Sequence, residues 1–258
     1  MTNARRVLVH ADSDALVASI AARFLTKIVD LLEEYDRVNI VLEGGGIQVR
    51  VLEAINASPA RDTIDWSRIH VWWGDERWVP EGDAERNDGK ARRALLDHIA
   101  IPAENIHPCP TSDQITDLDE AAAVYAAELA RFADPESELA LPRFDIVFLG
   151  VGPDGHTASL FPERAEILER EATVVPVRNS PKPPPERITL TRAAINTAQR
   201  IWVELAGAEK ASVLGLAMAG AAYTEVPIAG MKGRKRTVFF VDQDAAAEVP
   251  ENLISPSY

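Results

Sequence analysis

A histidine and an aspartate lie two residues apart on a glycine-rich turn in the sequence Gly150-Val-Gly-Pro-Asp-Gly-His-Thr-Ala-Ser-Leu-Phe-Pro162. The imidazole of His156 titrates near neutral pH, which suits a general base that takes a proton from water. Asp154 lies close enough in sequence to orient or polarise that imidazole, or to bind a ligand hydroxyl. We therefore expect acid-base chemistry at His156 and Asp154.

A second glycine turn is made by Gly44, Gly45 and Gly46. It follows a strand pattern over residues 38–42 and precedes helical periodicity over residues 47–56. In this layout, backbone N–H groups and a helix N-terminus can hold a phosphate. Three glycines alone are a weak signal, because any tight turn needs glycine, so a purely structural turn is the alternative.

Two further segments carry charged residues that suit a phosphate-containing ligand. The strand pattern over residues 68–73 is followed by residues 74–80, a charged stretch that contains Asp75 and Arg77. We expect Asp75 to be a hydroxyl ligand or an acid-base partner, and Arg77 to be a phosphate-binding cation. The alternative is a solvated loop whose acid caps a helix.

The segment Ser180-Pro-Lys-Pro-Pro-Pro-Glu-Arg187 contains four prolines around Lys182. Proline makes such a segment stiff and extended and keeps it out of a central sheet. Lys182 and Arg187 on a rigid arm would suit anion binding. A surface linker with solvated charges is the alternative.

The elements that must position these residues alternate between strands and helices, which indicates an α/β protein with a parallel or mixed sheet covered by helices on both faces. Residues 145–149 read as a buried strand, and residues 157–160 as the start of a helix. Ligands of such open sheets bind beyond the carboxyl ends of the strands, where both glycine turns fall.

Composition excludes several classes of protein. The chain has 258 residues and a formal net charge of −13, which disfavours binding to nucleic acid and to anionic membranes. Cys109 is the one cysteine, and no stretch reaches the ~18 apolar residues of a membrane span. We expect a cytoplasmic protein that forms a single domain over residues 1–258.

Cofactor sites are not apparent. No two histidines lie at the spacing of a metal site, and the glycine turns do not match the dinucleotide-binding pattern. We therefore expect neither a metal nor an organic cofactor.

Together, these segments resemble the 6-phosphogluconolactonase family over nearly the whole chain. The resemblance rests on residues 150–162, on Trp73-Gly-Asp-Glu-Arg77 with Asn87 downstream, and on residues 180–190. It implies hydrolysis of 6-phosphoglucono-δ-lactone to 6-phosphogluconate in the pentose phosphate pathway. It also implies a Rossmann-like fold shared with glucosamine-6-phosphate deaminase, and no cofactor.

One departure from the family concerns the first glycine turn. Family members carry a serine or threonine after the glycine pair, whereas this chain continues as Gly46-Ile47. One lost hydrogen bond of about 0.5–1.5 kcal/mol would weaken phosphate binding by up to about tenfold.

Two other functions compete with lactone hydrolysis. A sugar-phosphate isomerase-deaminase would share the fold and resembles the chain at Asp75, Asp154 and His156. A sugar-phosphate sensor without catalysis is the second, although the chain has no basic helix-turn-helix segment. Oligomeric state is not predicted by the sequence.

Overall fold

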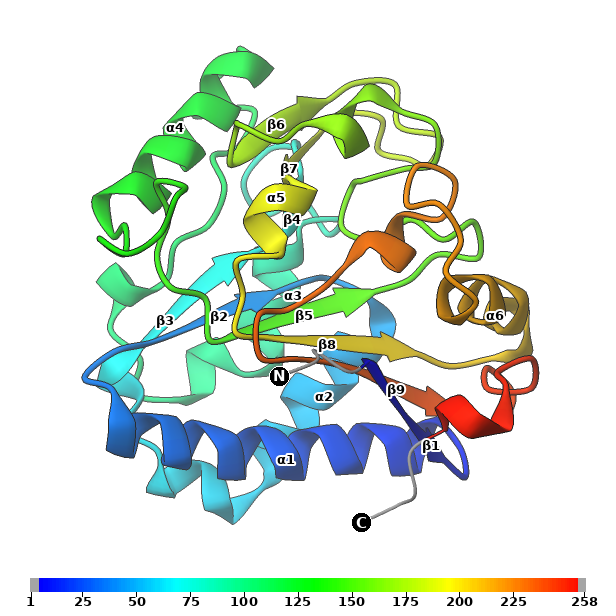
Figure 1. The fold of residues 1–258 in the computed structure, drawn as a ribbon. Coiled ribbons are helices and arrows are strands. Elements are labelled where there is room, and N and C mark those ends of the chain that lie inside the picture. The colour runs from blue at the N-terminus through cyan, green and yellow to red at the C-terminus, as the bar shows by residue number, and fades with distance from the viewer. Residues whose placement is uncertain (1–4, 255–258) are drawn as a thin grey trace.

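In the computed structural model, which describes residues 5–254, six parallel strands form a central sheet (Figure 1). In spatial order these are β1 (Arg5–His10), β9 (Arg236–Asp242), β8 (Arg200–Leu205), β5 (Ile146–Gly150), β2 (Val38–Leu42) and β3 (Ile69–Trp73). The chain proceeds from β2 to β3 in one direction across the sheet, and from β5 to β8 and β9 in the other. The strand order therefore reverses between β2 and β5, where the crevice of an open sheet binds ligands. The predicted single domain also includes residues 1–4 and 255–258, which lie outside the described residues.

Helices lie on both faces of this sheet, as the alternation of elements predicted. Helices α1 (Ser13–Glu34) and α2 (Gly46–Ala57) cover one face, and α3 (Asn87–Ala94) packs beside α2 (Figure 1). On the other side lie α4 (Leu118–Arg131), α5 (Arg192–Ile195) and α6 (Ala211–Met218). Within residues 5–254, no helix combines the length and the apolar character needed to cross a bilayer.

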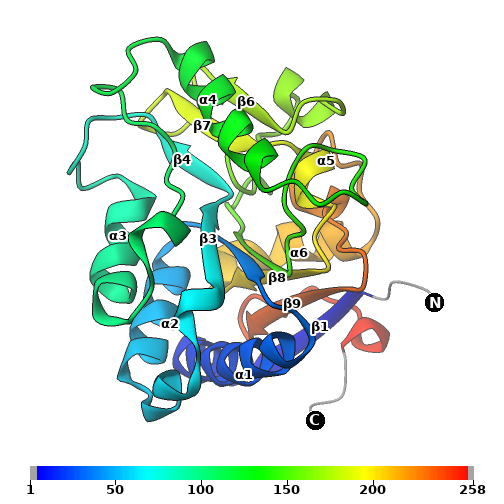
Figure 2. The ribbon, with the colours of Figure 1, turned by 90° about the vertical axis from the view of Figure 1, so that its left-hand side faces the viewer.

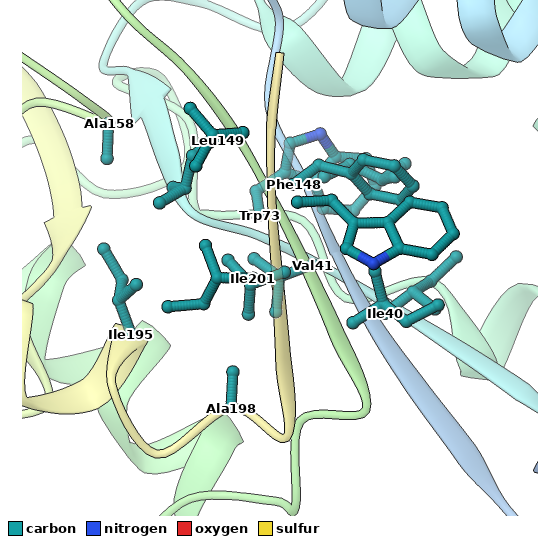
Figure 3. Packing of buried hydrophobic residues seen from close by; sticks show 14 of the residues in the cluster. Ile40, Val41, Trp73, Phe148, Leu149, Ala158, Ile195, Ala198 and Ile201 are labelled. Carbon is teal, nitrogen blue, oxygen red and sulfur yellow. The ribbon is translucent and has the colours of Figure 1, made fainter. Parts of the chain in front are cut away.

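The core follows the alternation of side chains along the strands. Ile40 and Phe148 lie on one side of the strands, and Val41, Leu149 and Ile201 lie on the other (Figure 3). Phe148 contacts Phe24 of α1 with ring centroids 5.8 Å apart. Because both sides of these strands are buried, the sequence shows continuous apolar runs rather than alternation with polar residues.

A second, antiparallel sheet contains β4 (Asp75–Arg77), β7 (Arg187–Leu190) and β6 (Val174–Val177), with α4 packed against it (Figure 2). The solvated loop that was the alternative for residues 74–80 is therefore wrong at β4, where Asp75 and Glu76 are buried. Its charged residues have little strand preference, and pairing with β7 imposes the extended backbone. Pro176 lies on β6, an edge strand, as its missing N–H predicted.

Residues 157–160 do not begin a helix, which corrects the second local prediction. Thr157 and Leu160 instead exchange backbone hydrogen bonds across a tight turn in which Ala158 has a φ of 48°. Thr157, Ser159 and Leu160 are all buried. The positive φ of Ala158 is incompatible with a right-handed helix, and hydrogen bonds from Ser159 to Thr189 and Asp75 fix the turn instead.

Candidate active site

A cavity of about 180 Å³ opens at the carboxyl ends of β2, β5 and β8. It lies at the reversal of strand order, as expected for an open α/β sheet. Its lining includes His156, Asp75, Arg77, Arg187 and residues 44–46, so most of the predicted site residues meet there. Asp154 and Lys182 are not in the lining, and they lie beside His156 instead.

His156 and Asp154 form a hydrogen-bonded pair. The Nδ1 atom of His156 lies 2.6 Å from Oδ1 of Asp154. The Asp154 carboxylate accepts a hydrogen bond from the Nδ1–H group, which leaves Nε2 of the neutral ring as the basic atom. The ring also stacks on Phe161, with centroids 4.6 Å apart. The arrangement orients a neutral imidazole to accept a proton.

Lys182 joins this pair from the proline arm. Its Nζ lies 3.3 Å from Oδ1 of Asp154 and 3.3 Å from Nδ1 of His156. Burial lowers the pKa of His156 below its usual range; Asp154 partly offsets this, and Lys182 adds to the lowering. Burial would raise the pKa of Asp154, but the bond to His156 and the charge of Lys182 outweigh it. His156 is therefore neutral, and Asp154 ionised, at neutral pH.

The glycines of this turn make room for the imidazole. A Cβ on Gly152 would lie 2.1 Å from two ring atoms of His156, so no other residue fits there without moving the ring. Gly155 has a φ of +82°, in the left-handed region that glycine adopts without strain. Backbone hydrogen bonds from Gly152 to His156 and from Ile228 to Gly155 fix the turn.

The turn of Gly44, Gly45 and Gly46 leads into the N-terminus of α2. Gly45 is the N-cap residue, and it supplies no side-chain hydrogen bond to the helix. The first N–H groups of α2 therefore lie at the cavity without a side-chain cap, and the helix dipole favours an anion there. A Cβ on Gly44 would overlap Asn87, which packs directly against this turn.

Asp75 lies at the opposite wall of the cavity and is held on several sides. Its Oδ2 accepts a hydrogen bond of 2.7 Å from Ser159 Oγ, and Asn87 Nδ2 donates to its backbone oxygen at 3.0 Å. Arg187 Nη1 lies 3.9 Å from Oδ2. The Ser159 hydroxyl is thus engaged with Asp75 and has no hydrogen bond to His156 in the described part of the chain.

The two acids of the Asp75-Glu76-Arg77 sequence have different environments. Glu76 is fully buried and accepts hydrogen bonds from the backbone of Arg77, Asn87 and Asp88. Its carboxylate caps the N-terminus of α3, which is the structural role that was the alternative for this segment. Arg77 lines the cavity, and its Nη1 donates to Glu85.

Arg187 reaches the cavity but is mostly engaged in the proline arm. Its Nε and Nη2 donate to the carbonyls of residues 182–184, and only 3% of the residue is exposed. Its Nη1 is directed toward Ser159 and Asp75. Arg187 therefore anchors the arm, and one edge of its guanidinium faces the site.

Sequence reasoning missed three charged residues of the lining: Glu43, Glu204 and Lys210. Each follows or ends a strand at the carboxyl edge of the sheet, and that position was the available signal. Glu43 directly follows β2, Glu204 is the fifth residue of β8, and Lys210 lies in the turn that leads to α6. Lys210 Nζ donates a hydrogen bond to the Val151 carbonyl.

Residues 5–254 hold no group of three or more histidine, cysteine, aspartate or glutamate side chains placed to bind a metal ion.

Comparison with known proteins identifies relatives of this architecture. The family model of glucosamine-6-phosphate isomerases/6-phosphogluconolactonase matches residues 11–240. The chain is 45% identical to a 6-phosphogluconolactonase of Streptomyces coelicolor, over 100% of this chain and 99% of that protein.

Solved structures show the same fold. The 6-phosphogluconolactonase from Thermotoga maritima is 29% identical, with a TM-score of 0.80 over 93% of this chain and 100% of that one. A monomeric glucosamine-6-phosphate deaminase is 17% identical, with a TM-score of 0.75 over 94% of this chain and 99% of that one, and it shows the fold alone. From the family match and the identity along its whole length, the chain belongs to the glucosamine-6-phosphate isomerase/6-phosphogluconolactonase family.

Proposed function

We propose that this chain is a carboxylic ester hydrolase that converts 6-phospho-D-glucono-1,5-lactone to 6-phospho-D-gluconate, in the pentose phosphate pathway. The observation that carries the proposal is the His156–Asp154 pair beside a cavity that is also lined by the N-terminus of α2, which has no side-chain cap. A base and an anion site in one small cavity suit a substrate with a reactive carbonyl and a distant phosphate. The names of the most similar proteins support the same substrate.

In the proposed reaction, Nε2 of His156 takes a proton from water as the water oxygen bonds to the lactone carbonyl carbon. The carbonyl π electrons move to its oxygen, which becomes an oxyanion. When that oxyanion re-forms the carbonyl, the bond from carbon to the ring oxygen breaks, and the imidazolium can return the proton to the ring oxygen. A δ-lactone is an activated ester, so the reaction requires no covalent nucleophile.

The remaining site residues are assigned to binding. Asp75 faces the cavity from a fixed position and suits a sugar hydroxyl. The backbone N–H groups at residues 44–46 and the Arg77 guanidinium suit the phosphate. Lys182 lies against His156 and Asp154, which makes it a positioning residue for the base, while Arg187 holds the arm and faces Asp75.

The working unit is proposed to be the single domain of residues 1–258, acting in the cytoplasm on a small sugar-phosphate lactone without a cofactor. The acidic composition supports this assignment against nucleic-acid binding.

Lactone hydrolysis tests the proposal directly. The lactone hydrolyses spontaneously, so it is generated in the assay from glucose 6-phosphate, and its decay is compared with and without protein. Acceleration by the wild-type chain that disappears in His156→Ala is the expected result. Acceleration that survives in the variant would remove His156 from its role as base.

The deaminase reading remains the alternative within the enzyme class, because a deaminase shares the fold. Ammonia release from glucosamine 6-phosphate at an enzymatic rate would overturn the lactonase assignment. Tight binding of 6-phosphogluconate without any turnover of the lactone would instead favour a sugar-phosphate sensor without catalysis.

A further inference from the structure

Glu43 occupies an unusual place for an acid, because it lies in the part of the cavity that is proposed to bind phosphate. It follows β2 directly and precedes Gly44. Cβ atoms built on Gly45 and Gly150 would lie 3.0 Å and 2.5 Å from its carboxyl oxygens. The carboxyl group therefore lies between the α2 N-terminus and the end of β5, and both glycines make room for it.

A second carboxyl group lies next to this position. Glu204 is paired in register with Gly150, the residue over which the Glu43 carboxyl lies. Glu204 is 2% exposed, and neither of its carboxyl oxygens has a hydrogen-bond partner in the described part of the chain. A buried carboxylate without a partner is costly, whereas a buried carboxylic acid costs far less.

The cations of the cavity do not neutralise Glu43. Arg77 is ion-paired with Glu85, and Lys210 donates to the carbonyl of Val151. Arg187 is directed toward Asp75 and the carbonyls of the proline arm. Among residues 5–254, no ion pair of 4.0 Å or less joins Glu43 to any of these three cations. An ionised carboxylate would attract the cations that share its small cavity, so this geometry fits a neutral Glu43.

The electrostatic environment agrees with that geometry. Burial raises the pKa of Glu43 to about 7; the Gly150 backbone, Lys210 and Arg77 lower it, and Asp75 raises it. Burial and the proximity of Glu43 raise the pKa of Glu204 well above its usual range. Burial therefore favours the neutral acid at Glu204, and Glu43 changes its charge near physiological pH.

We propose that Glu43 is a phosphate-binding residue that acts as a neutral carboxylic acid, donating a hydrogen bond to the substrate phosphate beside the Gly44–Gly46 turn. This proposal rests on the proposed function for the identity of the ligand. It assigns to Glu43 the side-chain hydrogen bond that the glycine turn lacks, since Gly46 and Ile47 carry no hydroxyl. Glu204 is a positioning residue whose uncharged carboxyl group lies next to that of Glu43.

The proposal makes anion affinity depend on the protonation of Glu43. The neutral acid donates a hydrogen bond, and the carboxylate repels an anion. Affinity should therefore be full below the pKa of Glu43 and fall by up to about tenfold per pH unit above it.

Other charged or titratable groups face the same space: Asp75 and Arg77 from β4, Arg187 from β7, Glu204 from β8, Lys210 from the turn after β8 and His156 from the turn after β5. All of them are also present in a Glu43→Gln variant, so comparing that variant with the wild type isolates Glu43.

The experiment measures binding of sulfate and of 6-phosphogluconate by calorimetry between pH 6.5 and 8.5. Sulfate keeps its charge throughout, so the titration of a phosphate does not complicate the result. The wild type, Glu43→Gln and Glu43→Leu are compared, with Glu53→Gln as a control because Glu53 is exposed on α2. Thermal unfolding of each variant shows whether it is folded.

We expect wild-type sulfate affinity to fall by roughly tenfold or more over this range. Glu43→Gln keeps an N–H donor and cannot ionise, so its affinity should stay within about twofold of the wild type at pH 6.5 and change less than about threefold up to pH 8.5. Glu43→Leu should bind sulfate about five- to tenfold more weakly than the wild type at pH 6.5. Glu53→Gln should follow the wild type.

Parallel pH profiles for the wild type and Glu43→Gln would overturn the proposal, and so would sulfate affinity that rises with pH in the wild type. Lactone hydrolysis is measured separately on the same proteins. A wild type that shows the sulfate profile but does not hydrolyse the lactone would refute the proposed function and leave the anion-binding role of Glu43 in place.

Discussion

The Nδ1 atom of His156 and the Oδ1 atom of Asp154 lie 2.6 Å apart, and Lys182 Nζ lies 3.3 Å from each of them. Asp154 stabilises a protonated imidazole, whereas Lys182 and burial destabilise it. The basicity of His156 is therefore set by two neighbours with opposite effects. Each neighbour can be removed separately, which makes their contributions measurable.

Asp154→Asn should lower kcat for lactone hydrolysis by about 10–100-fold, because the ring loses the acceptor that fixes its tautomer and orientation. Since Asp154 raises the pKa of His156, its loss should also move the acid limb of the rate profile to lower pH. The profile of kcat/KM against pH checks both effects. Asp36→Asn, at an exposed position, is the control and should match the wild type.

Lys182→Met should move the same acid limb in the opposite direction. The positive charge of Lys182 lowers the pKa of His156, so removing it raises that pKa. At pH 8 the imidazole is neutral in both proteins, and the rates should differ less there than at pH 6. An acid limb that moves to lower pH in Lys182→Met would contradict the assigned contact between Lys182 and His156.

Gly152→Ala should impair catalysis more than folding. The new Cβ would lie 2.1 Å from two atoms of the His156 ring, so the ring must leave its position over the turn. We expect kcat to fall by more than about tenfold. Gly89→Ala on α3 is the matched control, since the nearest atom there is the end of the flexible Arg93 side chain at 3.3 Å. An active Gly152→Ala enzyme would show that the ring position in this structure is not required.

Much of the central sheet was predictable, because its strands are continuous apolar runs between glycine, proline and charged residues. Val38–Leu42 forms a strand over the predicted residues. Asp12 caps α1 by accepting a hydrogen bond from the Ala15 N–H, an interaction within three residues. These features depend on local sequence, so they could be predicted without knowledge of contacts between residues far apart in the chain.

The elements that the sequence did not predict depend on contacts between residues far apart in the chain. Asp75–Arg77 forms a strand because β7, more than 100 residues later, supplies its partner. The turn over residues 157–160 is fixed by hydrogen bonds from Ser159 to Thr189 and Asp75, although its residues suit a helix. Neither relationship is visible in a local pattern.

The candidate site shows the same division. The glycine turns and the His156–Asp154 pair could be predicted from residue type and spacing alone. Glu204 lies inside an apolar strand pattern, Arg200-Ile-Trp-Val-Glu-Leu205. A single acid in such a strand does not by itself indicate a functional site. Its role in the site becomes visible only from its strand register opposite Gly150 and from its proximity to Glu43.

Tyr125 links α4 to the end of β3, and its removal should lower stability. Its hydroxyl donates to the Trp73 carbonyl and accepts from the Trp73 N–H, both at 2.9 Å, in the buried core. Tyr125→Phe would leave both backbone groups without this partner, which should lower the free energy of unfolding by about 2–3 kcal/mol. Urea unfolding measures the change, with Val124→Ala as the control, because Val124 is 43% exposed on the same helix. A loss below about 0.5 kcal/mol would mean that other groups or water satisfy the end of β3 in solution.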